Sequence, residues 1–198
     1  MKPSLPTRQP RMTKEARRAD IFAEAILIIG ELGYRAFSLS DLARRCGLTN
    51  AGLLHYFGSK EGLLIALLQE RDRQDERAVA AVLEPYISSE PITREACRAS
   101  LHAIVARNAG QPDMIRLYAM LRAEALAPDH PAYRFFRNRE TATIELFRQM
   151  VTGHVPDPLS TARQIEALMN GFEAQWLRQD CRFDLVAEWD KVVTLIIA

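Results

Sequence analysis

FSLSDLARRCGLTNAGLLHYFGSKEGLL, residues 37–64, is the stretch of sequence that decides the fold. Ser38 followed three residues later by Asp41 has the spacing of a capping box at the start of a helix. That helix would be about two turns long, because Gly47 can end it. Thr49 can cap a second short helix with its hydroxyl group. Two short helices joined by a tight glycine turn form a helix-turn-helix unit, which this stretch therefore predicts.

Helical periodicity continues on both sides of this unit. Before it, apolar residues recur at helical spacing from Ile21 to Leu32, and Gly33 can end that helix in a left-handed conformation. After it, Ser59 can cap a longer amphipathic helix that has leucines on one side and a polar continuation at residues 70–73. We expect this longer helix to connect two domains.

The remainder of the chain reads as helices separated by prolines, and no stretch has the alternating pattern of a strand. Five further helices are expected near residues 92–108, 112–127, 131–153, 160–179 and 184–197. The chain is therefore predicted to be all-α, with about nine helices. The predicted divisions are a disordered basic arm (1–13), the helix-turn-helix domain (14–58) and a larger helical domain (59–198).

The composition is that of an ordinary globular protein, with 26% charged and 48% hydrophobic residues. The charge is divided unevenly along the chain. Residues 1–60 hold 10 Lys or Arg against 5 Asp or Glu, whereas the rest holds 16 against 20, so the front is +5 and the back is −4. A basic front on an acidic body indicates that the front faces a polyanion such as nucleic acid, although a solvated basic surface would give the same count.

Several other classes of protein are not expected. The cysteines Cys46, Cys97 and Cys181 lie far apart without the spacing of a disulfide framework or a zinc site, so we expect no metal and no cofactor. The histidines lack the i, i+4 spacing of a helical metal site, and no glycine loop could cradle a phosphate, so an enzyme is not expected. No run approaches the roughly 18 apolar residues of a membrane span, and no signal peptide is recognised, which predicts a cytoplasmic protein.

Residues 15–65 closely resemble the DNA-binding domain of the TetR family of regulators. The matching pieces are Glu31 to Tyr34, Ser38, Asp41 to Ala43, Gly47, Thr49, His55 to Phe57 and Ser59 to Glu61. One departure is Leu54, which stands where the family often has an aromatic residue. The resemblance implies a DNA reader in front, a ligand-sensing and dimerisation domain behind it, and repression as the usual mode of regulation.

The second short helix of the motif has residues suited to contacts with a duplex. Asn50 can bond an adenine edge, Ala51 can contact a thymine methyl group, and Gly52 lets the backbone come close. We expect Asn50 to read a base and the other polar residues to position the protein on the phosphates. The predicted DNA-binding residues are Ser38, Arg44, Arg45, Thr49, Asn50, Ala51, Gly52, His55, Tyr56 and Lys60; Lys60 follows from the resemblance. Arg8 and Arg11 of the arm could add salt-dependent attraction.

The larger domain contains residues that could line a pocket for a small molecule. An apolar cavity with a few polar anchors is the usual construction of such a site. The residues proposed for it are His102, Tyr118, Leu121, Arg122, Glu124, Tyr133, Phe136, Phe172 and Trp176. Aromatic residues at helical spacing are also typical of an ordinary core, which is the alternative for each of them.

Small residues near the C-terminus predict a contact between two copies of the chain. Ala167, Gly171 and Ala174 recur at i, i+4 and i+7, and this stripe would let another helix approach closely. The final helix adds Trp189 and Val192. TetR-like proteins pair their last two long helices across a two-fold axis, so the resemblance implies a homodimer, whereas packing within one chain is the alternative.

Together these features predict a sequence-specific regulator that binds double-stranded DNA as a homodimer. The expected behaviour is repression at a palindromic operator and release by an unidentified small-molecule effector. The alternative is an all-α sensor or adaptor whose helix-turn-helix unit mediates contacts with proteins.

Overall fold

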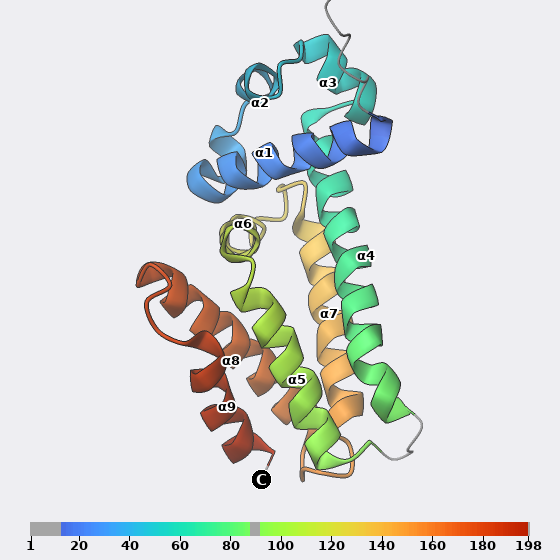
Figure 1. Ribbon diagram of the computed structural model, residues 1–198, viewed down its shortest axis with the longest axis vertical. Helices are drawn as coiled ribbons and strands as arrows, with labels where there is room; N and C mark the ends of the chain where they lie inside the picture. The colour runs from blue at the N-terminus through green and yellow to red at the C-terminus, as the bar shows by residue number, and fades with distance from the viewer. Residues whose placement is uncertain (1–12, 88–91, 198) are drawn as a thin grey trace, which may run out of the picture.

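The computed structural model describes residues 13–87 and 92–197, whose regular secondary structure is entirely α-helical, as predicted (Figure 1). The helices are α1 (Lys14–Ala36), α2 (Leu39–Arg45), α3 (Asn50–Phe57), α4 (Lys60–Ile87), α5 (Arg94–Ala109), α6 (Pro112–Glu124), α7 (Tyr133–Val151), α8 (Pro158–Arg178) and α9 (Leu185–Ile196). The five helices expected after α4 are all present, with ends shifted by a few residues. The expected arm, with Arg8 and Arg11, lies outside the described residues except for Thr13. In the described ranges, no helix is both long enough and apolar enough to cross a membrane.

The turn between α2 and α3 has the predicted local geometry. Gly47 has a φ of 62°, a conformation that glycine adopts without a steric penalty, and it directly follows the C-cap of α2. Thr49 is the N-cap of α3, where its hydroxyl oxygen accepts a hydrogen bond of 3.1 Å from the backbone N–H of Gly52. The expected helix-turn-helix unit is therefore formed by residues whose preferences act over only a few positions.

The start of α2 has an N-cap but not the predicted capping box. Ser38 is the N-cap, and its hydroxyl accepts a hydrogen bond of 3.2 Å from the N–H of Ser40. Asp41 was expected to complete the box, but its carboxylate contacts Arg44 and Arg45 of the same helix. Ser38 therefore caps the helix through the N–H of its second residue, and the two bonds between Ser38 and Asp41 that define a capping box are not formed.

Gly33 interrupts α1 close to its C-terminal end. It has φ 78° and ψ 164°, after which the helical assignment continues to Ala36, so the glycine makes a kink where a clean stop was expected. The kink aims the backbone N–H of Tyr34 at Glu124, whose Oε2 accepts its hydrogen bond at 2.8 Å. A β-carbon on Gly33 would lie 2.5 Å from Oε1 of the same carboxylate. Glycine is thus needed both for the backbone angle and for the close approach of α6.

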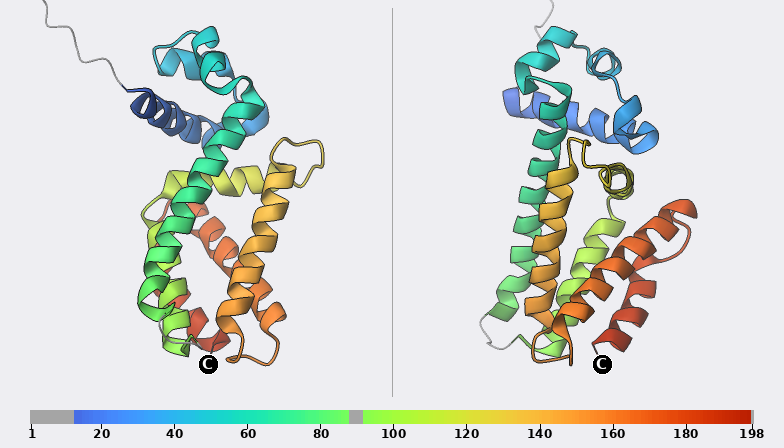
Figure 2. Two further views of the ribbon diagram at one scale, coloured as in Figure 1. Left: turned by 90° about the vertical axis from the view of Figure 1, so that its right-hand side faces the viewer. Right: turned by 180° about the vertical axis from the view of Figure 1, so that it is seen from behind.

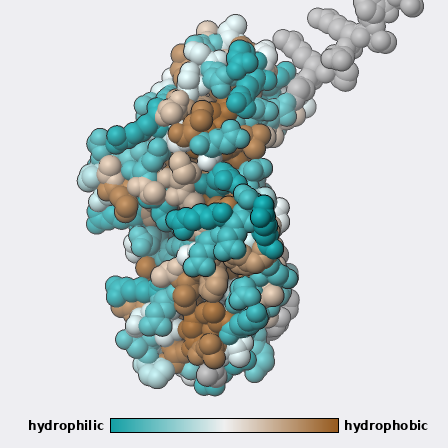
Figure 3. Space-filling model, turned by 90° about the vertical axis from the view of Figure 1, so that its left-hand side faces the viewer, coloured by the Kyte–Doolittle hydropathy of each residue, from teal (hydrophilic) through white to brown (hydrophobic). Residues whose placement is uncertain are grey.

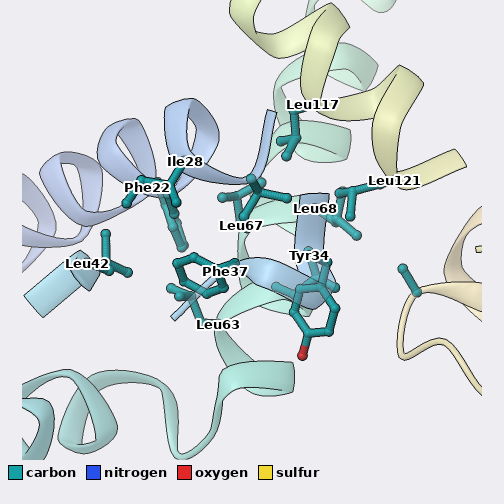
Figure 4. Close-up of a cluster of buried hydrophobic side chains, with 14 of the residues drawn as sticks. Phe22, Ile28, Tyr34, Phe37, Leu42, Leu63, Leu67, Leu68, Leu117 and Leu121 are labelled. Atoms are coloured by element: carbon teal, nitrogen blue, oxygen red, sulfur yellow. The ribbon is translucent and has the colours of Figure 1, made fainter. Parts of the chain in front are cut away.

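Two hydrophobic cores run through the molecule. The first core contains residues of α1, α2, α3 and α4 and continues into α6. Leu117 and Leu121 of α6 therefore lie in the same cluster as Phe22, Leu42 and Leu63 (Figure 4). The second is formed mainly by α5, α7, α8 and α9, in which α7 packs against α8 and α5 packs against α9. Figures 1 and 2 show α4 extending from the helix-turn-helix end into the larger helical body. The first core therefore ties α6 to the N-terminal helices.

Candidate nucleic-acid interface and internal cavity

Helix α3 lies at one end of the molecule and presents its N-terminal turn outward (Figure 2). Leu53 is 1% exposed and anchors the helix in the first core. Asn50, Ala51 and His55 are exposed, and so is Leu54, the position of the departure from the family pattern. The helix is therefore fixed on one side and free on the other, which is what a helix that enters a DNA groove requires.

The structure gives Asn50 a partner that the sequence did not suggest. Its side-chain Nδ2 donates a hydrogen bond of 2.8 Å to the hydroxyl oxygen of Ser40 in α2. This bond joins the two helices of the motif directly at the first turn of α3. Asn50 would have to rotate away from Ser40 to present both amide groups to a base.

The basic residues of this region are partly occupied within the chain. Arg44, with 75% of its side chain exposed, bonds to Asp41, and this hydrogen bond lowers the pKa of that carboxyl. Arg45 lies 3.4 Å from Asp41 and 3.8 Å from Glu24. The ammonium group of Lys60 lies 4.5 Å from the centre of the Tyr34 ring, a cation–π distance. These basic groups remain accessible to solvent, but each would exchange a contact within the chain for a contact with DNA.

Nine of the ten predicted DNA-binding residues lie on α2, α3 or their N-caps, Lys60 begins α4, and none of the ten is buried. The exposed ones are Ser38, Arg44, Arg45, Thr49, Asn50, Ala51 and His55, and the half-buried ones are Gly52, Tyr56 and Lys60. The fold thus gathers them in one region. Their contacts with DNA stay predictions.

A cavity of about 560 Å³ lies inside the larger helical body, lined by residues of α4, α5, α6, α7 and α8. Its volume is in the range of small-molecule sites. One wall carries a network of charges centred on Asp75, whose carboxylate contacts Arg71 at 2.8 Å, Arg139 at 3.1 Å and Arg107. Arg139 also contacts Asp72. In this network every arginine has an aspartate partner.

The α8 part of the cavity lining carries two carboxyl groups. Glu173 is 7% exposed, and its Oε1 accepts a hydrogen bond of 2.7 Å from the side-chain amide of Asn108. Glu166 stands two turns earlier on the same helix and also lines the cavity. Burial raises the pKa of both carboxyls, because the charged form is poorly solvated there.

Two of the nine predicted pocket residues, Tyr118 and Arg122, line this cavity. The remaining expectations for this cavity are corrected. His102 is exposed and lies 2.9 Å from Asp190 of α9, and Glu124 bonds to Tyr34 at the junction with α1. The other five residues are absent from the cavity lining: Leu121 and Phe136 belong to the first core, Phe172 and Trp176 pack in the second, and Tyr133 begins α7 half-buried.

Sequence reasoning also missed the most polar part of the cavity. The sequence predicts residues 70–73 only as a polar continuation of α4, whereas Arg71 is 4% exposed. The arginine and Asp75 are one helical turn apart and do suggest a pair. Nothing in that spacing indicates that Arg107 and Arg139, from two other helices, converge on the same carboxylate.

The predicted dimer residues fall into two groups. Ala167 is exposed, while Gly171, Ala174 and Val192 are half-buried, and a β-carbon on Gly171 would meet nothing within 4 Å among the described residues. Trp189 is fully buried in the second core, which corrects its assignment to a surface. Apolar side chains gather on the part of the molecule where α8 and α9 lie (Figure 3), and Leu195 of α9 is 80% exposed. A free apolar face therefore exists on these helices without Trp189.

The buried carboxyl of Glu173 has a consequence for stability. In the unfolded chain its pKa returns to the ordinary 4.5, so between that value and the raised native pKa the folded protein holds a proton that the unfolded chain has lost. The free energy of unfolding should therefore fall as the pH rises through this window. Glu173→Gln should make the fall shallower in urea titrations at a series of pH values above 4.5, and an unchanged slope would contradict this assignment.

Known proteins resemble the chain in both sequence and fold. Residues 21–67 match the family described as bacterial regulatory proteins, tetR family. The HTH-type transcriptional regulator BetI of Paraburkholderia phymatum is 32% identical over 100 residues, covering 48% of this chain and 45% of that protein. BetI of Rhizobium meliloti is 43% identical over 53 residues, covering 27% and 26%. The match thus spans less than half the length of these curated relatives.

The solved structures extend the likeness to nearly the whole chain. The fatty acid degradation regulator FadR of Bacillus halodurans has a TM-score of 0.70 at 20% identity, covering 94% of this chain and 97% of that one. A TetR transcriptional regulator of Legionella pneumophila has a TM-score of 0.73 at 19% identity, covering 96% and 100%. At these identities the likeness establishes the fold. Residues 21–67 therefore carry the sequence of the tetR family of bacterial regulatory proteins, and the chain as a whole has the fold of solved TetR regulators.

Proposed function

We propose that the chain is a sequence-specific transcriptional regulator that binds double-stranded DNA in the cytoplasm. The observation that carries the proposal is the helix-turn-helix unit, with the exposed first turn of α3 held by the buried Leu53. A helix of 8 residues is about 12 Å long, which suits entry into a major groove. The basic front of the chain supplies the sequence-independent attraction to phosphates.

The regulator acts as a homodimer at a palindromic operator. One short reader contacts only a few base pairs, and a second reader about 34–36 Å away would engage the next turn of the duplex. The exposed faces of α8 and α9, with Ala167, Gly171 and Leu195, are the surface for this pairing. This surface differs from the first expectation in that Trp189 stays inside each subunit.

A small-molecule effector in the cavity releases the repressor from DNA. Helix α6 supports this route, because it carries Tyr118 and Arg122 on the cavity side and Leu117 and Leu121 in the core shared with α1. A ligand that favours one position of α6 would bias the placement of the reader helices through differential binding. One structural neighbour, FadR of Bacillus subtilis, was solved with stearoyl-CoA, which is a ligand of that protein.

The competing proposal is an adaptor whose helix-turn-helix unit binds proteins. A DNA reader must lose affinity steeply as salt rises, because neutralised phosphates release counterions. An adaptor would show a flat response. The uneven charge of the chain favours the DNA reader.

Selection of duplexes from a random pool tests the function, and Asn50→Ala tests the reader. The wild type should enrich a palindrome at moderate salt, and the variant should lose about 1–3 kcal/mol of discrimination at one base pair of each half-site. Ser40→Ala is the matched control, because it removes the contact between Ser40 and Asn50 while leaving the amide free. Failure to enrich any sequence at any salt concentration would contradict the proposal.

A further inference from the structure

The cavity contains charges that are already satisfied and polar atoms that are not. Arg71, Arg107 and Arg139 are paired with Asp72 and Asp75 within the protein. Because these ion pairs are formed within the protein, a ligand would gain little by contacting the paired charges. The selectivity of the cavity must therefore come from the remaining polar groups.

Two residues that line the cavity each carry a buried polar atom without a partner among the described residues. Among the described residues, Oε2 of Glu166 and the hydroxyl group of Tyr118 are buried and have no hydrogen-bond partner. The Tyr118 side chain is more than nine-tenths buried. Leaving such atoms unpaired costs free energy, so a ligand that pairs them gains more than one that meets water-exposed groups.

The surroundings of Glu166 leave its charge incompletely compensated. Burial raises the pKa of its carboxyl and the nearby Glu140 raises it further, while Arg122, Asn170 and Arg139 act in the opposite direction. Asn170 acts through a hydrogen bond to the Glu166 side chain, but none of the three bonds to the buried Oε2. The missing group is a hydrogen-bond donor, and a positively charged donor would also compensate the charge.

The rest of the lining suits an apolar body. Ile104, Met114, Ile115, Leu146, Phe147 and Met169 face the same cavity from four helices. Methionine side chains fill irregular gaps and tolerate ligands of different shape. An anionic head group placed at the half-exposed Arg122 is the competing arrangement, but it would leave Glu166 without a donor.

We infer that the cavity binds an amine, a ligand with an apolar body and a protonated N–H-bearing head group that donates a hydrogen bond to Glu166. The inference rests on the proposed function, in which this cavity holds the effector. A primary ammonium group offers both the donor and the charge, whereas a quaternary ammonium group offers only the charge. The hydroxyl of Tyr118 provides a second polar contact in the same cavity.

Calorimetric titration of the full chain without DNA tests the head group. The probes are octylamine, octyltrimethylammonium, octanol and octanoate, which share one apolar body. Octylamine should bind the wild type roughly ten- to a hundredfold more tightly than octanol, the range expected for a buried hydrogen bond to a charged group. Tighter binding of octanoate or of octyltrimethylammonium than of octylamine would overturn the inference.

Glu166→Gln should remove most of the preference for octylamine and leave octanol binding within about twofold. The variant should fold, because an amide replaces a buried carboxyl whose charge lacks a full set of partners. Glu140→Gln is the matched control, since Glu140 is exposed and does not line the cavity but lies near Glu166. Equal octylamine affinity in Glu166→Gln and wild type would overturn the inference.

These titrations separate the inference from the proposed function. They contain no DNA, so a failure to find an operator would leave the ligand result standing. Conversely, if the protein binds an operator but prefers octanoate, the proposed function would stand and the inference of an amine ligand would be overturned.

Discussion

Trp189→Ala is expected to lower the free energy of unfolding by about 3–5 kcal/mol, the range for truncating a large buried aromatic side chain. The indole is fully buried in the core that joins α5, α8 and α9, and its removal leaves a cavity that this packing cannot close. Urea unfolding at one fixed protein concentration measures the change. The comparison needs a fixed concentration because a dimer gains stability by mass action.

Trp189→Phe is the matched control for this prediction. It keeps most of the apolar volume and removes the indole N–H, which is buried without a partner among the described residues. Its cost should be well below that of the alanine variant. If Trp189→Ala instead unfolded like the wild type but sedimented as a monomer, the side chain would belong to the subunit interface and its placement in the core would be wrong.

Asp75→Ala is expected to cost about 3 kcal/mol, because it leaves three arginines without their shared carboxylate. The estimate is at the low end for a buried ion pair, since Arg107 and Arg139 are 25% and 29% exposed and solvent screens them in part. Thermal and urea unfolding of the variant measure the loss. The same change should widen the polar part of the cavity.

Asp72→Ala provides the comparison for Asp75. Asp72 contacts only Arg139 among the described residues, and that arginine keeps Asp75 as a second partner. Its loss should therefore cost well under half as much. Equal costs for the two variants would show that Asp75 does not organise the network.

The helix-turn-helix unit could be predicted from the sequence because its determinants are local. The φ of Gly47 and the cap formed by Thr49 depend on residues within three positions along the chain. The bond between Asn50 and Ser40 could not be predicted in the same way, because it depends on the angle between two helices. Local sequence preferences therefore predicted helix α3 but not the hydrogen bond between its first turn and α2.

The C-terminal helix shows why a residue of a correctly predicted helix can still be assigned to the wrong contact. Leu185, Trp189, Val193 and Ile197 recur every four residues, and all four are buried. This i, i+4 stripe was available in the sequence and indicates the inward face of α9. Choosing between a core and an interface for it required the position of α5, which packs against α9.

The cavity was the least predictable part of the molecule. Its lining comes from five helices, and most of the aromatic residues chosen for it fill the two cores. Charged residues such as Asp75 and Glu173 line it because residues distant in sequence compensate their burial. Periodicity reports which residues share a helix face, but not which faces leave a space between them.

The central claim is that two reader helices act together at a fixed separation on DNA. The most direct test is the equilibrium affinity of the full chain for its selected palindrome, compared with the same duplex carrying an insertion of about five base pairs, half a helical turn, between the half-sites. The account predicts that the insertion lowers affinity at least about tenfold, since one reader would face the wrong side of the duplex. Equal affinity for the two duplexes would contradict it.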